Sequence, residues 1–374
     1  MQLELYKNLY SMNETDFWKN GIDESLAEVD KKVTSAFAKS FDRVTFVGCG
    51  TSNFAGIYGR GLFEKLLGIP CAVLEGNTAR YTDDKLYTAN TLYIGVSNTG
   101  NSGTVVESMQ LAHDKGCKTL CITGDETSKI AQASDVVLFF AGKKDTVPTK
   151  TRSYVETLMM LAALAVKLCE LKGVNVPFTR AYFKGQAEKL AHAAQGLFAQ
   201  YSEPLKALAE SWKGKHSYNV VGANLHQATA QEGSLKICEI GWVNSQAMEL
   251  ENYLHGKLRG VDSESPYFIV GTDDISYPLV LTYVGLAKKT GADAVVISDH
   301  ITKPVKDLAA HYIEIEAGID ELLKPFIFIL PFYIFGMHLG IARGHENPSV
   351  SHFDRPAQNT RLADIFPEYG GQEY

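Results

Sequence analysis

The stretch that decides the fold reads VTFVGCGTS over residues 44–52, a short β-prone run followed by a glycine-rich turn and the start of a helical pattern. The same succession of apolar run, turn and helix recurs along the first half of the chain. Such alternation is typical of an α/β protein with a parallel sheet. The expected strands are Val44–Val47, Cys71–Leu74, Thr91–Val96, Thr119–Ile122 and Val136–Phe140, and the expected helices are Asn53–Leu67, Thr104–Lys115 and Thr151–Leu171.

A second run of the same kind follows a long helical region, Thr179–Lys213. The two runs correspond, because Val47-Gly48 ahead of one helix matches Val221-Gly222 ahead of another. We infer an internal duplication of one nucleotide-fold-like module. In the second copy the expected strands are Tyr218–Val221, Gln246–Leu250, Tyr267–Val270 and Ala294–Ser298, and the expected helices are Leu225–Ile240 and Tyr277–Thr290.

The composition limits the partners of the protein. The chain of 374 residues has 36 Lys and Arg against 43 Asp and Glu, a formal net charge of -7. It has no overall basic field for a nucleic acid or an anionic membrane, so an anionic ligand must be held by local geometry. Six cysteines without a Cys-x-x-Cys pair, and an N-terminus without a secretory signal, predict a cytoplasmic protein. Pro331 and Gly336 interrupt the apolar stretch Pro325–Ala342, which favours a buried core helix over a membrane span.

Two turns of the first copy carry candidate ligand-binding chemistry. Gly48–Ser52 follows the first expected strand, and SNTGNSGT over residues 97–104 follows a later one. Parallel sheets bind ligands beyond the carboxyl ends of their strands, where helix N-termini offer free amides. The hydroxyls of Ser97 and Ser102 suit a phosphomonoester, although Ser, Asn and Gly also form ordinary turns and helix caps.

No motif of the chain predicts a cofactor or a metal. Neither turn is a P-loop or a dinucleotide-binding fingerprint. His338, His345 and His352 are spaced by seven, but Pro348 lies among them and no metal-ligand pattern is formed. We therefore expect neither group.

The second copy contains further polar residues of two possible kinds. Glu232, Lys236 and Glu239 share one helix face by their spacing, which is compatible with a solvated charged stripe or with a site. His255 is by the same reasoning a polar loop residue or a proton-transfer group. A basic cluster after the fifth strand either forms a solvated rim or binds an acidic part of a substrate; it consists of Lys143, Lys144, Lys150 and Arg152.

At these residues the sequence resembles the sugar isomerase (SIS) domain family, most closely the paired SIS domains of glucosamine-6-phosphate synthase and of fructosamine-6-phosphate deglycases. The resemblance covers nearly the whole chain, from about Trp18 onward. It implies an α/β fold of two tandem SIS domains, each a nucleotide-fold-like αβα sandwich with a parallel sheet flanked by helices. The expected domains are residues 18–178 with the phosphate-binding loops, 179–343 with the catalytic Glu and His, and a tail over the active site at 344–374.

The resemblance also implies which residues bind sugar and phosphate. Gly48–Ser52 is similar to the first loop of the family, residues 97–102 are similar to its phosphate loop, and VPTK over residues 147–150 is similar to a segment beside the sugar. The implied contacts are Gly50, Thr51, Ser52, Ser97, Asn98, Thr99, Ser102, Val147, Thr149 and Arg361.

EGSLKICEI over residues 232–240 is similar to the EGALKLKEI helix of the family, with the spacing to His255 kept. The resemblance implies that Glu239 moves a proton between C1 and C2 and that Lys236 balances charge beside it. His255 is implied as the ring-opening group, supplied in the family by the neighbouring subunit. A homodimer with a shared active site is therefore expected.

Two departures from the synthase decide the expected reaction. The synthase has a glutaminase domain with a cysteine next to the initiator methionine, whereas this sequence has Gln2 there and enters the SIS region almost at once. Its Schiff-base lysine corresponds to Arg361, and an arginine stays protonated and cannot form an imine. A substrate that already carries nitrogen does not need that lysine. We therefore expect a deglycase for a 6-phosphorylated fructosamine, with Lys143, Lys144 and Lys150 meeting a carboxylate of the leaving amine.

Two alternatives stay open. One is another enzyme, an aldose–ketose isomerase or an amino-sugar-6-phosphate deaminase. The other is a non-catalytic phosphosugar sensor, although such regulators usually carry a basic helix-turn-helix domain, for which the roughly forty residues before the first strand are too few and too acidic. In each case the expected ligand is a small 6-phosphosugar or an amino-acid–sugar phosphate, not a nucleic acid or a membrane.

Overall fold

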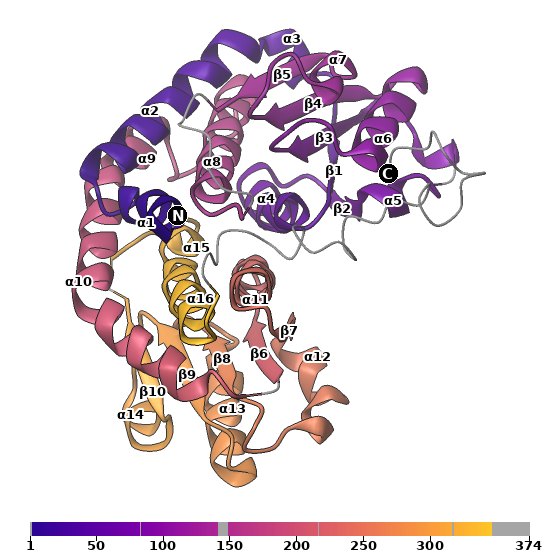
Figure 1. Ribbon diagram of the computed structural model, residues 1–374. Helices are drawn as coiled ribbons and strands as arrows, with labels where there is room; N and C mark the ends of the chain where they lie inside the picture. Colours follow the sequence, from indigo (N-terminus) through magenta and orange to yellow (C-terminus); the bar gives the residue numbers. More distant parts are fainter. Residues whose placement is uncertain (1, 83, 141–148, 216, 316–317, 346–374) are drawn as a thin grey trace. The chain divides into compact units, whose positions relative to one another are not determined.

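The computed structural model describes residues 2–82, 84–140, 149–215, 217–315 and 318–345, which form two compact units (Figure 1). The first unit comprises residues 23–180. The second unit comprises the described residues of 2–22 and 181–345. Each unit contains one five-stranded parallel sheet, so the predicted α/β class is confirmed.

The sheet of the first unit has the strand order β2-β1-β3-β4-β5. All five strands were expected from short apolar runs, and each occurs where it was predicted. The strands are β1 (Arg43–Gly48), β2 (Cys71–Glu75), β3 (Thr91–Ser97), β4 (Lys118–Thr123) and β5 (Val136–Phe139). The helices are α2 (Thr15–Lys32), which begins in the second unit, α3 (Ser35–Ala38), α4 (Thr51–Leu67), α5 (Gly76–Ala79), α6 (Gly103–Asp114), α7 (Lys129–Gln132) and α8 (Arg152–Lys172), with a 3₁₀ turn η1 (Asp84–Leu86).

The sheet of the second unit repeats this order as β7-β6-β8-β9-β10, which confirms the internal duplication. Its strands are β6 (Ser217–Gly222), β7 (Asn244–Glu249), β8 (Tyr267–Val270), β9 (Ala294–Ser298) and β10 (His311–Glu314). Its helices are α1 (Gln2–Ser11), α9 (Arg180–Gly185), α10 (Ala187–Trp212), α11 (His226–Gly241), α12 (Leu250–Leu254), α13 (Tyr277–Thr290), α14 (Lys303–Leu308), α15 (Lys324–Phe328) and α16 (Leu330–Ala342), with a 3₁₀ turn η2 (Lys257–Gly260).

Two glycines show the duplication at atomic detail. Gly48 ends β1 and Gly222 ends β6. A Cβ atom on Gly48 would lie 2.7 Å from the backbone carbon of Ser52, and one on Gly222 would lie 2.5 Å from the carbonyl oxygen of His226. In both modules the first turn of the next helix therefore packs against the strand end, and only glycine leaves room for it.

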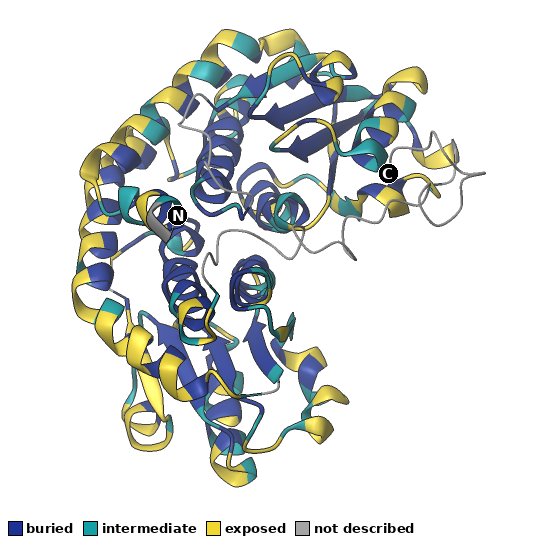
Figure 2. Ribbon diagram, in the orientation of Figure 1, coloured by how far each residue is buried: buried dark blue, intermediate teal, exposed yellow. Residues whose placement is uncertain are grey.

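The apolar helical segment Lys324–Ala342 is a core element. Its most apolar window has a mean hydropathy of 1.8, and 83% of that window is buried inside the protein. The segment packs against α10 and α11, and Figure 2 shows α11 and α16 as largely buried ribbons. The predicted buried core helix is confirmed.

Several elements of the second unit were not expected, β10 and α1 among them. Strand β10 buries only Ile313 among its four residues, so it lacks an apolar run. Helix α1 buries Leu5 and Leu9 in the second unit. The predicted helical region Thr179–Lys213 is divided into α9 and α10, with Gln186 between them.

Candidate functional site

The first of the predicted loops joins β1 to α4. Cys49 and Gly50 form the turn, and Thr51 and Ser52 lie half-buried in the first turn of the 17-residue helix α4. No acidic residue stands in that first turn. The free amides of a helix N-terminus carry partial positive charge, so this end of α4 favours an anion.

The second loop joins β3 to α6 and is held by its own hydroxyl groups. The backbone N–H of Gly100 donates to Ser97 Oγ over 3.1 Å, and Ser97 Oγ lies 3.4 Å from Ser102 Oγ. Gly100 has a φ of 68°, and a Cβ there would lie 2.0 Å from Ser128 Oγ. Ser97 is buried, whereas Asn98 is half-buried and Thr99 is exposed. The loop is thus pre-formed around Ser97 and leaves polar groups at its surface.

The structure brings these two loops together. Cys49 Sγ of the first loop lies 3.8 Å from the hydroxyl of Thr104 in the first turn of α6. Strands β1 and β3 are neighbours whose following helices leave from the point where the strand order reverses, and open α/β sheets bind ligands there. The 12-residue helix α6 also has no acidic residue in its first turn. Two helix N-termini and several hydroxyls make a site suited to phosphate.

The remaining residues predicted for this half of the site are only partly described. Thr149 is buried and Lys150 is half-buried just ahead of α8. Arg152 forms an ion pair with Glu156 of the same helix over 2.8 Å, and its side chain is only 14% exposed, so it does not form a solvated rim. The other predicted contacts lie outside the described residues; they are Lys143, Lys144, Val147 and Arg361.

In the second unit, the charged stripe of α11 is buried. Lys236 Nζ lies 2.7 Å from Glu239 Oε2 and 3.3 Å from Glu232 Oε1. The side chains of Glu232 and Lys236 are 0% and 1% exposed, whereas that of Glu239 is 34% exposed. A solvated charged face is therefore excluded, and Glu239 is the one of the two carboxylates that reaches the surface.

Close packing of α11 against α16 causes this burial. A Cβ on Gly233 would lie 2.6 Å from the ring of Phe332, and one on Gly336 would lie 3.1 Å from the carbonyl oxygen of Lys236. A glycine on each helix thus lets the two backbones approach. Tyr333 of α16 donates its hydroxyl to Glu232 Oε1 over 3.4 Å. Tyr333 was not predicted as a site residue, since a lone hydroxyl in an apolar helix was its only sequence signal.

The electrostatics of the cluster keep Lys236 charged. Burial alone would lower the pKa of the ammonium, but the carboxylates of Glu232 and Glu239 reverse this and raise it. The ammonium lies within ion-pair distance of both carboxylates. The cluster therefore presents one partly exposed carboxylate, Glu239, beside a buried cation on α11, an arrangement suited to a general base.

The partner that His255 contacts is not a member of the α11 cluster. His255 follows α12 and its Nε2 lies 3.1 Å from Glu251 Oε1. The His255 side chain is 72% exposed. It is available to a ligand or to another molecule, and its recorded partner is Glu251 rather than a member of the α11 cluster.

His226, the first residue of α11, carries a pH dependence of stability. It is 4% exposed and stacks on Phe328 at 4.6 Å between ring centroids. Burial, together with the Lys324 ammonium and against the carboxylates of Asp299 and Asp274, lowers its pKa to about 4. The unfolded chain binds a proton at His226 below about pH 6.5 while the folded chain does not, so stability falls as the pH drops from 6.5 toward 4.

We expect His226→Phe to remove this component. Between pH 7 and about 4.5 the wild-type protein should lose about 2 kcal/mol of unfolding free energy more than the variant. Urea titrations of both proteins across this range measure the difference. Stability curves that run parallel in the two proteins would show that His226 is not buried in its neutral form.

Comparison with known proteins identifies the family. Residues 37–167 and 213–341 each match the SIS domain family, and together they make up more than half of the chain. A curated relative, the glutamine–fructose-6-phosphate aminotransferase (isomerizing) of Thermococcus kodakarensis, is 25% identical over 320 residues, which are 85% of this chain and 52% of the relative. The chain thus spans about half the length of the curated relatives it matches.

Solved structures share the fold. The C-terminal domain of glucosamine-fructose-6-phosphate aminotransferase from Francisella tularensis superposes with a TM-score of 0.82 at 22% identity, covering 91% of this chain and 96% of that one. A glucosamine-6-phosphate deaminase from Thermotoga maritima gives 0.67 at 20% identity, with 93% and 97% covered. With a family match in each unit and the same sheet order in both, the chain belongs to the SIS domain family and contains two such domains.

Proposed function

We propose that the protein is a cytoplasmic phosphosugar-processing enzyme that cleaves a 6-phosphorylated fructosamine into an aldose 6-phosphate and an amine. The observation that carries the proposal is the α11 cluster, in which buried Lys236 pairs with the partly exposed carboxylate of Glu239. Burying the charges of Glu232 and Lys236 costs free energy. A purely structural ion pair would not need a further, partly exposed carboxylate beside them.

The first unit would hold the phosphate. The loops after β1 and β3 supply hydroxyls and two helix N-termini with no acidic residue in their first turns. Gly50, Thr51 and Ser52 would contact phosphate and sugar from one loop, and Ser97, Asn98, Thr99 and Ser102 from the other. Neutral donors and helix ends bind a dianion without a basic field, which agrees with the net charge of -7.

The second unit would carry out the proton transfer. Glu239 takes a proton from C1 of the ketosamine, the electron pair of the C–H bond forms a C1–C2 double bond, and the C2 oxygen gains a proton. Protonation at C2 then gives the imine at C1. Water adds to C1, the C1–N bond breaks, and the amine leaves with a proton. One base and one acid are sufficient for this sequence.

The other predicted residues would support these steps. Lys236 would balance the charge of Glu239, and His255 would assist ring opening. The high exposure of His255 suits a residue that serves the active site of a partner subunit, as a homodimer with shared sites would require. Lys143, Lys144 and Lys150 would meet a carboxylate on the leaving amine, and Val147, Thr149 and Arg361 would contact sugar or phosphate.

The sequence favours amine release over amine transfer. Arg361 stands where the synthase-like pattern has its Schiff-base lysine, and an arginine cannot form an imine with an open-chain sugar. The substrate must then bring its own nitrogen. A ketose–aldose isomerase or an amino-sugar-6-phosphate deaminase is the second candidate, since a structural neighbour is a glucosamine-6-phosphate deaminase.

Product analysis tests the proposal. The full chain is incubated separately with a 6-phosphorylated fructosyl amino acid, with glucosamine 6-phosphate and with fructose 6-phosphate, and the products are identified by mass spectrometry. We expect the free amino acid and an aldose 6-phosphate from the first substrate. Ammonia from the second substrate alone would establish a deaminase, and an aldose from the third alone would establish an isomerase. Thermal stabilisation by all three without turnover would establish a sensor.

The phosphate loop gives a separate prediction. Ser97→Ala removes a buried hydroxyl that accepts a hydrogen bond from the Gly100 N–H and lies 3.4 Å from Ser102 Oγ. We expect affinity for glucose 6-phosphate to fall about tenfold or more, because a hydrogen bond to a charged group contributes about 1.5–3 kcal/mol. Isothermal titration measures this, with Ser134→Ala as the control, because that hydroxyl bonds the Ile130 carbonyl instead. Equal losses in the two variants would contradict the assignment.

A further inference from the structure

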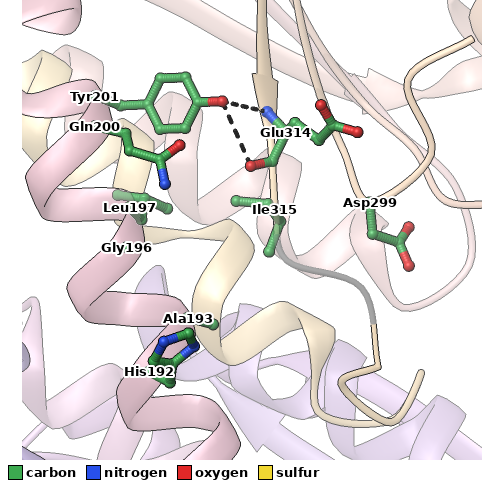
Figure 3. Close-up of a pocket in the computed structure, with 9 residues that line it drawn as sticks. All are labelled: His192, Ala193, Gly196, Leu197, Gln200, Tyr201, Asp299, Glu314 and Ile315. Atoms are coloured by element: carbon green, nitrogen blue, oxygen red, sulfur yellow. Dashed lines mark hydrogen bonds between the residues drawn. The ribbon is translucent and has the colours of Figure 1, made fainter.

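A cavity of about 460 Å³ lies in the second unit, beyond the carboxyl ends of β9 and β10 and against one face of α10. Figure 3 shows the helix side chains along one wall and Asp299, Glu314 and Ile315 along the other. This is the end of the sheet at which α/β folds place ligands, and the volume lies within the usual range of small-molecule sites. The cavity uses none of the residues assigned above to phosphate binding or proton transfer.

The polar groups of the cavity are fixed in place. The hydroxyl of Tyr201 receives the backbone N–H of Glu314 over 3.0 Å and ties the end of β10 to α10 (Figure 3). Asp299 accepts a hydrogen bond from Thr272 over 2.7 Å and pairs with Lys324 over 2.7 Å. The charge of Asp299 is therefore balanced, whereas the Glu314 carboxylate pairs with no cation among the described residues.

Carboxylates gather at this end of the second sheet. Here Asp299 follows β9, Glu314 ends β10, and Asp273 and Asp274 follow β8. Of these, Asp299 and Glu314 line the cavity, and Lys324 balances Asp299, so the Glu314 carboxylate gives the wall an acidic character that repels a phosphate and attracts a cation.

The helix side of the cavity leaves room and supplies hydrogen bonds. Gly196 lies in the interior of α10, where glycine costs about 0.5–1 kcal/mol relative to alanine. The nearest atom to a Cβ built there is Gln200 Nε2 at 3.9 Å. The Gln200 amide offers both donors and an acceptor toward the same space. Leu197 and Ile315 add an apolar surface on which a ring can pack.

We propose that this cavity is a second ligand site and that it binds a small hydroxylated amine. The ammonium group pairs with Glu314, and the hydroxyls bond Gln200 and the carboxylate oxygens of Asp299. The inference does not depend on the proposed reaction, because it rests on a different set of residues.

Binding to the full chain tests the site with glucosamine as the probe. Isothermal titration compares it with glucose, which lacks the ammonium, with glucosamine 6-phosphate, which adds an anion, and with putrescine, which lacks hydroxyls. We expect glucosamine to bind at least tenfold more tightly than glucose or putrescine. Glucosamine 6-phosphate is expected to bind at the loops after β1 and β3 instead. Its binding should therefore weaken in Ser97→Ala, whereas glucosamine binding should not.

Three variants locate the binding. Glu314→Gln should weaken glucosamine binding at least tenfold, whereas Glu203→Gln, which changes an exposed carboxylate elsewhere on α10, should not. Gly196→Leu should abolish binding by filling the cavity, and Gly196→Ala should keep both the fold and most of the affinity. Turnover of the phosphosugar should stay within about twofold in Glu314→Gln. No glucosamine binding, equal binding of glucose, equal binding of putrescine, or binding unaffected by Glu314→Gln and Gly196→Leu would each overturn the proposal.

Discussion

Glu239→Gln should lower the turnover of a 6-phosphorylated fructosamine about a hundredfold or more, because a positioned general base contributes roughly 10²–10⁴ in rate. The free energy of unfolding should change by less than about 1 kcal/mol. Glu239 is 34% exposed, and in the variant Lys236 keeps its contact with Glu232. Loss of activity without loss of stability separates a catalytic role from a structural one. Steady-state kinetics and urea titration of the same preparation measure both.

A matched substitution controls for the loss of a carboxylate. Glu210 is 59% exposed on α10 and pairs with Lys213, so Glu210→Gln should leave both turnover and stability close to the wild-type values. The assignment of the base is contradicted if Glu239→Gln turns over the substrate within about threefold of the wild-type protein.

Lys236→Met should destabilise the protein by about 3–5 kcal/mol and should also abolish turnover. Removing the ammonium leaves the Glu232 carboxylate buried at 0% exposure without its cation, beside the Tyr333 hydroxyl. Methionine preserves the length and much of the volume of the lysine side chain. The loss therefore reflects charge and not a cavity, and urea titration at pH 7 measures it.

The double variant Glu232→Gln with Lys236→Met should recover part of that stability, because it removes the buried charge that the single substitution leaves unpaired. Lys206→Met on α10 is the control, since its ammonium is 56% exposed and contributes little. A Lys236→Met protein within about 1 kcal/mol of the wild type would contradict the burial of this cluster.

The sequence predicted the sheets well because their strands are buried on both faces. All residues of β3 and of β9 are buried, so these strands occur as continuous apolar runs. The pairs Val47-Gly48 and Val221-Gly222 also marked equivalent strand ends, and the common strand order explains why. Strand β10 was not predicted, because an edge strand with one buried residue has no such run.

The environment of α11 could not be predicted from spacing. A stripe at positions 232, 236 and 239 has the same pattern whether it faces water or another helix. Its burial depends on Gly233 and Gly336, which lie about a hundred residues apart and act only once α16 packs against α11. The resemblance to a family implied a function for the stripe, whereas tertiary packing alone reveals Tyr333 as a partner of Glu232.

The acidic cavity of the second unit has a similar explanation. Its walls come from α10 and from residues that follow β9 and β10, which are separated by about a hundred positions in the chain. Asp299 and Glu314 look like ordinary loop and edge-strand residues in the sequence. Only the sheet order places them together at the carboxyl end of the sheet, where open α/β folds place ligands.

The retention of label at C1 tests the proposed reaction most directly. A 6-phosphorylated fructosamine carrying two deuterium atoms at C1 is converted in ordinary water, and the sugar phosphate produced is examined by NMR and mass spectrometry. Proton transfer from C1 by Glu239 predicts an aldose 6-phosphate with one deuterium at C1, and about a hundredfold less of it from Glu239→Gln. A product that keeps both deuterium atoms at C1, or that forms equally fast in Glu239→Gln, would contradict the mechanism.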